Sequence, residues 1–235
     1  MDLQLLNERL LEALIHGDRR DARRLVESAS GGGLSSAEII SDLFWPTYET
    51  VERLFRNDQL SRLGYHLSTR LLRVLTDQVA AGLEVPATAN NRTVLAFCGP
   101  NDADELGAQI AVDLLEANGF GMTFTGGGIP MDEILGHIHE NRPDAVLMFA
   151  SAPGDLPEIR RLIDTVREIG ACDGMQLIVG GGVFNRAEGL AEEIGADLWA
   201  EDPLELVDLM IHEPEHRAPA DQRTVGRTRK TRAAA

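Results

Sequence analysis

The spacing of apolar residues changes once along this chain, and the change divides it into two parts. Between residues 2 and 82, leucines recur at intervals of three and four, as in Leu3, Leu6, Leu10 and Leu14. This is the spacing of a helix with one buried face. It predicts four helices, over residues 2–16, 18–29, 36–56 and 60–82. Pro46 is expected to kink the third helix or to mark its restart.

After residue 92, short apolar and β-branched runs alternate with amphipathic helical stretches. The runs are TVLAFC, GMTFTG, DAVLMFA, MQLIVG and ADLWA. Such alternation predicts a parallel sheet wrapped by helices. The predicted fold class is therefore α/β: an N-terminal four-helix bundle followed by a flavodoxin-like, Rossmann-type domain with a five-stranded parallel sheet. The predicted boundaries are a helical cap bundle at 1–82, a linker at 83–92, the sheet domain at 93–214 and a basic disordered tail at 215–235.

The loops that follow the predicted strands are the expected binding edge of the sheet domain, since ligands of such folds bind at the carboxyl ends of the strands. Two loops carry triple glycines, Gly126–Gly128 and Gly180–Gly182. Glycine lets a ligand approach the backbone, although the same glycines also serve tight turns. A third loop holds Asp102 and Asp104 at the start of a helix, where helix capping by itself accounts for carboxylates.

Charge narrows the classes of partner. The formal net charge is −16, but residues from Arg217 onward carry six Lys/Arg against one acid, +5, which leaves −21 for residues 1–216. The acidic body is expected to repel nucleic acid, so direct DNA binding is expected only through the basic tail. No apolar run is long enough to span a membrane, and the two cysteines show no paired spacing. A cytoplasmic protein without a disulfide is expected, and self-association into a homo-oligomer stays open.

Motifs of common enzyme classes are missing from the sequence. Neither glycine loop has the spacing of a phosphate-binding loop. HEPEH at 212–216 superficially resembles a zinc-binding helix, but Pro214 interrupts the turn that would align its histidines. No complete set of acid, base and nucleophile is found, so an independent enzyme is not predicted.

The order of parts nevertheless resembles a known family. An eighty-residue helical bundle, a linker and a five-unit α/β domain containing IVGGGVF and EIGADLWAEDPLELVDL are similar to the cobalamin-binding proteins. That family includes the cobalamin module of methionine synthase, the corrinoid carriers of methyltransferase systems and light-sensing cobalamin-dependent regulators.

The resemblance implies a cofactor motif, D-x-H-x-x-G, whose histidine is the lower axial ligand of cobalt. Here the motif falls on Asp102 to Gly107, and Asp104 stands at the histidine position. A carboxylate is a harder and weaker partner for cobalt in a corrin than imidazole is, so histidine-type ligation is excluded at this position.

Two further elements of the family surround the nucleotide tail of cobalamin. The serine of an S-x-L motif falls on Phe149 in a gapless count, and on Ser151 if the alignment is shifted by two residues. The gapless count places a bulky ring where the tail would pass. A glycine pair after the fourth strand persists as Gly180, Gly181 and Gly182.

The helical half resembles the cap of the light-sensing regulators, in which Trp, nine residues and Glu-His cover the upper face of the cofactor. Here the same spacing gives Phe55, Tyr65 and His66. His66 is the candidate metal ligand, since neutral imidazole is a common one. Core packing of Phe55 and a surface position of His66 are the alternatives.

From this resemblance we expect a sensory or regulatory protein that holds a tetrapyrrole between its two halves and signals to a protein partner, with light as one candidate input. The expected cofactor is cobalamin without histidine ligation, or heme. The alternatives are an interaction scaffold that has lost its cofactor and a corrinoid methyl-carrier protein.

Overall fold

The structure is a computed structural model that describes residues 2–84, 90–99, 105–170 and 174–219. The chain forms two compact units, Met1–Pro86 and Ala87–Ala235. Within the described ranges, no helix combines the length and the apolar character that crossing a membrane would require.

The first unit contains the helices that the leucine spacing predicts. Its elements are α1 (Leu3–His16), α2 (Arg19–Gly31), a continuous run of α3 (Ser36–Glu38), the π-helix η1 (Ile39–Phe44) and α4 (Trp45–Arg56), and then α5 (Arg62–Ala80). Asp2 begins α1, because its side chain accepts hydrogen bonds from the first free amides of the helix. Gly17 ends α1 in the left-handed conformation, with φ 68°.

Pro46 is the second residue of α4, where the chain resumes the α-helical form directly after the π-helix η1. Proline cannot donate to the carbonyl four residues earlier, and the helix passes this point through the π-helical stretch 39–44. The carbonyl of Asp42 instead accepts a hydrogen bond from Asn7 Nδ2 of α1 at 3.2 Å. Asn7 Oδ1 in turn accepts from Thr47 Oγ1 at 2.8 Å. A single amide side chain therefore ties α1 to the altered turn.

The second unit is a five-stranded parallel sheet with strand order β2-β1-β3-β4-β5, which is the flavodoxin-like order. The strands are β1 (Thr93–Cys98), β2 (Gly121–Phe124), β3 (Ala145–Phe149), β4 (Gln176–Gly180) and β5 (Leu198–Trp199). The helices are α6 (Glu105–Ala117), α7 (Met131–Asn141), α8 (Leu156–Ile169) after a short 3₁₀ turn η2 (Pro153–Asp155), α9 (Gly182–Arg186), α10 (Leu190–Glu193) and α11 (Pro203–His212). The predicted fold class is confirmed.

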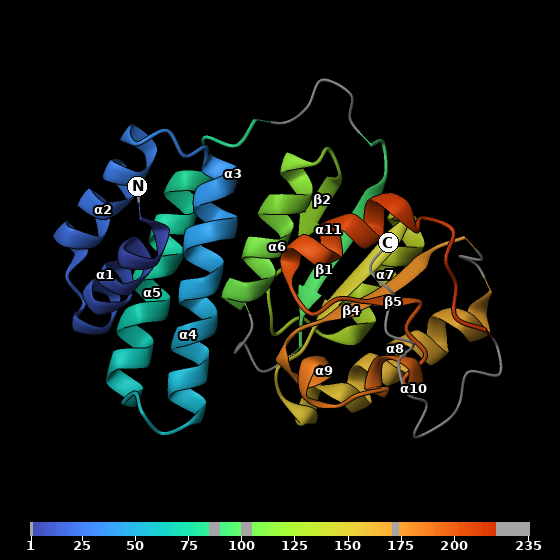
Figure 1. The fold of residues 1–235 in the computed structure, drawn as a ribbon. Helices are drawn as coiled ribbons and strands as arrows, with labels where there is room; N and C mark the ends of the chain where they lie inside the picture. The colour runs from blue at the N-terminus through green and yellow to red at the C-terminus, as the bar shows by residue number, and fades with distance from the viewer. Residues whose placement is uncertain (1, 85–89, 100–104, 171–173, 220–235) are drawn as a thin grey trace. The chain divides into compact units, whose positions relative to one another are not determined.

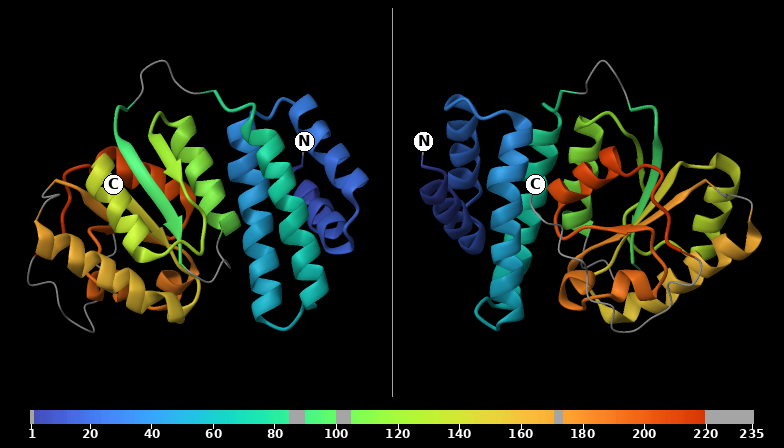
Figure 2. Two further views of the ribbon diagram at one scale, coloured as in Figure 1. Left: turned by 180° about the vertical axis from the view of Figure 1, so that it is seen from behind. Right: turned by 45° about the vertical axis from the view of Figure 1, so that its right-hand side comes forward.

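Helices cover both faces of this sheet (Figure 1). Alternate residues of β1, β3 and β4, such as Phe97 and Met148, pack with α7 and α8 in one core cluster. The intervening residues, including Cys98 and Phe149, therefore point to the opposite face, because successive side chains of a strand alternate. Figure 2 shows α6 and α11 on that opposite face of the sheet, and these two helices contact each other.

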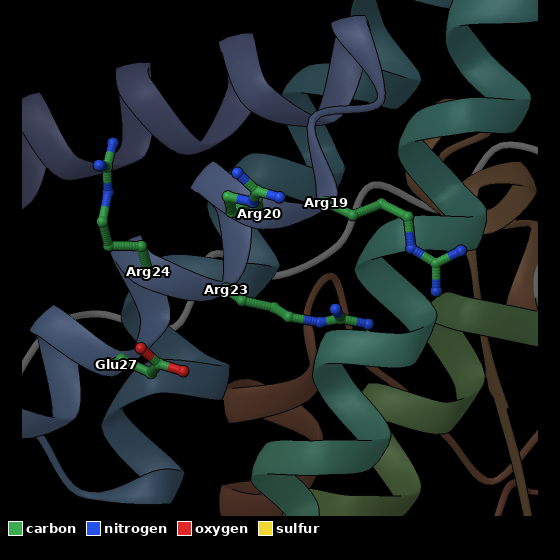
Figure 3. Close-up of a pocket in the computed structure, with 5 residues that line it drawn as sticks. All are labelled: Arg19, Arg20, Arg23, Arg24 and Glu27. Atoms are coloured by element: carbon green, nitrogen blue, oxygen red, sulfur yellow. The ribbon is translucent and has the colours of Figure 1, made fainter.

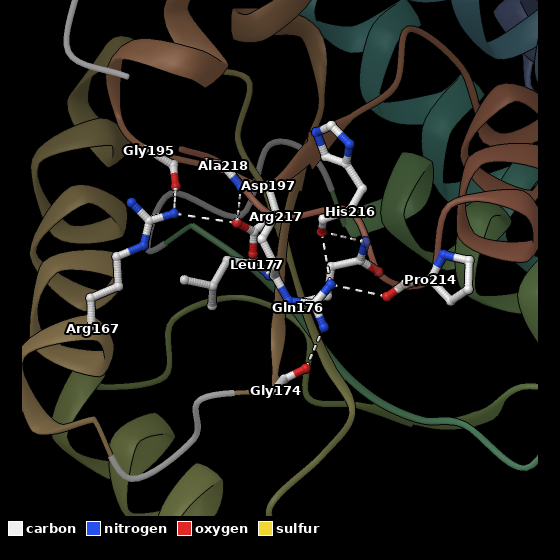
Figure 4. Close-up of polar contacts among 10 residues, drawn as sticks. All are labelled: Arg167, Gly174, Gln176, Leu177, Gly195, Asp197, Pro214, His216, Arg217 and Ala218. Carbon is white, nitrogen blue, oxygen red and sulfur yellow. Dashed lines mark hydrogen bonds and ion pairs between the residues drawn. The ribbon is translucent and has the colours of Figure 1, made fainter. Parts of the chain in front are cut away.

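The segment after α11 is bound at the amino ends of the strands (Figure 4). Gln176 Nε2 donates to the carbonyl of His216 at 3.2 Å, and it also donates to the carbonyl of Glu213 at 2.9 Å. Asp197 Oδ1 accepts from the Ala218 amide at 2.8 Å and from Arg167 at 3.3 Å, and its Oδ2 accepts from the Leu177 amide at 2.7 Å. The sequence prediction begins a disordered tail at residue 215, whereas residues 216–218 are held by these side chains.

Candidate functional site at the carboxyl edge of the sheet

The strand order changes direction between β1 and β3, and their carboxyl ends define the candidate site. Ligands of flavodoxin-like folds bind at this switch point. The two strand ends are joined directly, because the Gly99 amide donates to the Phe149 carbonyl at 2.8 Å. Asp102 and Asp104 follow Gly99 but lie outside the described residues. The motif's last residue, Gly107, lies partly exposed in the first turns of α6.

Asp155 is a carboxylate at this switch point that the sequence interpretation missed. It is 2% exposed, and its Cγ and Oδ2 lie 2.6 and 2.7 Å from the position that a Cβ on Gly99 would take. A side chain at position 99 would overlap the Asp155 carboxyl group, so this position requires glycine. The only sequence signal was its place in SAPGD, directly after a buried strand.

Phe149 occupies the space above Gly180. The two residues are opposite each other in the β3–β4 register. Cε1 and Cδ1 of the ring lie 3.3 and 3.4 Å from the position of a Cβ on Gly180, and Phe149 is 6% exposed. The ring thus packs where a side chain of β4 would otherwise stand, in the manner of an aromatic residue that covers a strand glycine.

The other two glycines of this run are also explained by contacts within the chain. Gly181 has φ +102°, and a Cβ there would lie 2.4 Å from the Ala150 carbonyl oxygen. A Cβ on Gly182 would lie 2.7 Å from an end nitrogen of Arg186. That guanidinium group also donates to the carbonyl of Ser151. The sequence indicated glycines that admit a ligand, and the structure shows that the chain's own atoms lie against all three.

Gly126 closes the same edge on the side of β2. It has φ +74°, its carbonyl accepts from the Cys98 amide at 3.0 Å, and a Cβ on it would lie 3.5 Å from Glu105 Oε1. The structure therefore brings Gly126, Ser151 and the Gly180–Gly182 run to one edge of the sheet, as the parallel topology requires.

The predicted aromatic cap residues form a cluster on the helical unit. The rings of Phe55 and Tyr65 stack with centroids 4.1 Å apart, and His66 meets Tyr65 edge-on at 5.8 Å. Tyr65 donates its hydroxyl proton to Glu52 at 2.6 Å. Phe55 is half-buried and His66 is exposed. Phe55 is thus not a core residue, and the cluster presents an aromatic surface.

In the described part of the chain, His66 has no neighbouring side chains with which it could form a metal site. No group of three His, Cys, Asp or Glu residues able to hold a metal ion is found among those residues. An axial contact from a single histidine to a cofactor metal needs no such group, so its role as a ligand stays a prediction.

A hollow on α2 is lined by Arg19, Arg20, Arg23, Arg24 and Glu27 (Figure 3). Arg24 is paired with Asp21. The hollow is open and its lining is charged, unlike the largely apolar walls of a cofactor pocket. It is therefore a cationic surface on an acidic chain, and we do not assign the cofactor to it.

Comparison with known proteins finds family matches for both units. A family described as B12 binding domain matches residues 92–208, and a second family with the same description matches residues 6–79. Dimethylamine corrinoid protein 1 of Methanosarcina acetivorans is 27% identical over 193 residues, which cover 80% of this chain and 88% of that protein.

Two further relatives are similar to this chain. Dimethylamine corrinoid protein 3 of Methanosarcina mazei is 28% identical over 106 residues, covering 45% of this chain and 62% of that protein, so this match spans less than two thirds of it. The structure of the monomethylamine corrinoid protein of Methanosarcina barkeri has a TM-score of 0.75 at 19% identity, covering 88% of this chain and 98% of that one; it shows the shared fold. With both of its units matched, the chain belongs to the cobalamin-binding domain family that combines a helical cap with a Rossmann-like domain.

Proposed function

We propose that this chain is a corrinoid carrier, which holds a cobalamin-type cofactor at the carboxyl edge of its sheet and presents it to a partner methyltransferase. The observation that carries the proposal is the flavodoxin-like strand order, with the loops after β1 and β3 joined at the switch point by the Gly99–Phe149 hydrogen bond. When bound, a corrinoid supplies a cobalt centre that accepts and releases a methyl group.

The relatives favour the carrier over the sensory protein that the sequence suggested. Those reported above are named corrinoid proteins, which supports cobalamin rather than heme.

The residues of the sheet edge fit a corrinoid only in part. The loops at the switch point leave backbone and glycine at Gly126 and Gly128, where a flat ring can approach. The space beside Gly180 does not fit an inserted nucleotide tail, because the Phe149 ring packs against that glycine. Asp104 at the position of the lower ligand adds to this misfit, since a carboxylate binds cobalt in a corrin more weakly than imidazole does.

The first test is pigment retention by the full chain. The protein is incubated separately with hydroxocobalamin, with cobinamide, which has the corrin ring but no nucleotide tail, and with hemin, and is then passed through gel filtration. Co-elution of at least one corrinoid, without hemin, is the expected result. A chain that retains neither corrinoid contradicts the carrier function and favours a scaffold without a cofactor.

Two additions separate the alternatives. The absorption spectrum is recorded in the dark and after illumination, and a light-dependent change would favour the sensory function over the carrier. The variant His66→Ala is compared with His16→Ala, an exposed histidine at the end of α1. A spectral shift in His66→Ala alone would identify His66 as a ligand, and identical spectra would remove it.

A further inference from the structure

We infer that Phe149 sets the class of corrinoid that this chain takes: one without a nucleotide tail, in preference to cobalamin. This inference rests on the proposed function and goes beyond it, since it names a residue that selects between ligands sharing the same ring.

The position of the ring carries the inference. Phe149 is the last residue of β3, on the face covered by α6 and α11, and its ring edge lies 3.3 Å from the Cβ position of Gly180. A glycine at the end of β4 leaves a gap beside the strand, and here the gap is filled from within the chain. A tail entering at this point would meet the ring before it met the glycine backbone.

The backbone of Phe149 cannot move aside to admit a tail. β3 is a central strand, and Phe149 is opposite Cys98 of β1 and Gly180 of β4. Its carbonyl accepts from the Gly99 amide at 2.8 Å, and the next amide, of Ala150, donates to the Gly180 carbonyl at 3.0 Å. The ring therefore has to leave its packing by rotation of the side chain, which exposes apolar surface to water.

The Arg186 side chain at the same edge yields more easily than the Phe149 ring. Arg186 lies over Gly182 through the end of a long, exposed side chain, and its rotation gives up one hydrogen bond to the Ser151 carbonyl, which water can replace at an exposed position. Of these two side chains, Phe149, at 6% exposure, is therefore the stronger barrier to a ligand.

A nucleotide tail hinders binding in both of its arrangements. An inserted tail has to displace the Phe149 ring. A tail that stayed folded beneath the corrin would add bulk between the ring and the protein. Cobinamide has no tail and meets neither obstacle. The chain should therefore bind cobinamide about tenfold or more tightly than cobalamin, which is the change in affinity that corresponds to displacing a packed side chain.

The experiment is a spectral titration of the full chain with cobinamide and with cobalamin, both carrying the same upper ligand. It compares the natural chain, Phe149→Ala and the control Met148→Ala. Met148 precedes Phe149 in β3, is 0% exposed and belongs to the core on the α7 and α8 face. Its truncation produces a comparable core cavity away from the proposed barrier.

We expect the natural chain to bind cobinamide at least about tenfold more tightly, Phe149→Ala to reduce that ratio to within about threefold by gaining affinity for cobalamin, and Met148→Ala to keep the natural ratio. Equal binding of both pigments by the natural chain, or an unchanged ratio in a folded Phe149→Ala protein, would overturn the inference. If circular dichroism shows Phe149→Ala to be unfolded, the ratio of the natural chain and that of Phe149→Leu decide. If the natural chain binds neither cobinamide nor cobalamin, the proposed function itself is contradicted.

Discussion

Replacing Gly181 by alanine tests whether the glycine run serves the fold before it serves a ligand. Gly181 joins β4 to α9 with φ +102° and ψ 165°, a region that side-chain-bearing residues essentially do not occupy. A Cβ would lie 2.4 Å from the Ala150 carbonyl oxygen and 2.9 Å from its carbonyl carbon and its amide nitrogen. These are backbone atoms, so no side-chain rotation relieves the overlap.

The magnitude follows from two contributions. The backbone conformation costs about 1–3 kcal/mol for a residue with a Cβ. Moving Ala150 also strains the hydrogen bonds that its carbonyl accepts from Val183 at 3.2 Å and that its amide donates to Gly180 at 3.0 Å, each worth about 1 kcal/mol. Gly181→Ala should therefore lower the free energy of unfolding of the sheet unit by about 3–5 kcal/mol.

The matched control is Gly128→Ala, since Gly128 has φ +74° but nothing within 4 Å of its Cβ position. Its cost should be about 1–2 kcal/mol, from the left-handed conformation alone. Both variants are unfolded in urea in a Trp45→Phe background, in which the fluorescence comes from Trp199 of β5. A difference between the two variants below about 1 kcal/mol would refute the steric explanation.

Replacements at four positions test further polar contacts of the two units. Asn7→Ala should lower the free energy of unfolding of the helical unit by about 1–2 kcal/mol in urea, because a carbonyl in the π-helical turn loses its donor; no change would mean that water replaces the amide. Asp197→Asn should lower the free energy of unfolding by about 2–4 kcal/mol, since this buried carboxylate accepts from three donors. Asp164→Asn, in a partly exposed ion pair with Arg160, should lower it by less than about 1 kcal/mol. Equal losses would contradict the difference in burial. Hydrogen bonds from the Ser35 hydroxyl and amide lower the pKa of Glu38 from 4.5, so the stabilisation is present above that value and is lost as pH falls through the lowered pKa. The melting temperature of Glu38→Gln should lie below that of the natural chain at pH 7 and meet it in stronger acid, and a gap independent of pH would exclude the ionised carboxyl as the cause.

The elements and their order could be predicted because each depends on local spacing. The leucine intervals place α1 and α5, and the β-branched runs place every strand within a residue or two. The backbone conformation around Pro46 could not be predicted, because it depends on Asn7. This residue lies 35 positions from Asp42, whose carbonyl accepts its hydrogen bond. Pattern analysis does not detect such polar contacts between distant residues.

The sequence predicts which loops meet at one edge of the sheet but not which residues pack against them. Parallel topology by itself brings the glycine loops to one edge. What lies over each glycine depends on residues elsewhere in the chain: Phe149 over Gly180 and Asp155 beside Gly99. A glycine in a sequence shows that space is needed at that position, and only the packing shows whether a ligand or the protein's own side chain takes it.

The π-helical turn at 39–44 also fixes the rotational phase of α4. Each residue of an α-helix advances the chain by about 100°, so a shortening of this stretch by one residue would turn everything after it by about that angle relative to the start of the helix. The side of α4 that carries Phe55 and Glu52 would then no longer meet Tyr65. Single-residue deletions in residues 39–44 should accordingly be tolerated far less well than deletions in the loop at 32–34, and the aromatic surface of the cap depends on the length of a segment that lies three turns away from it.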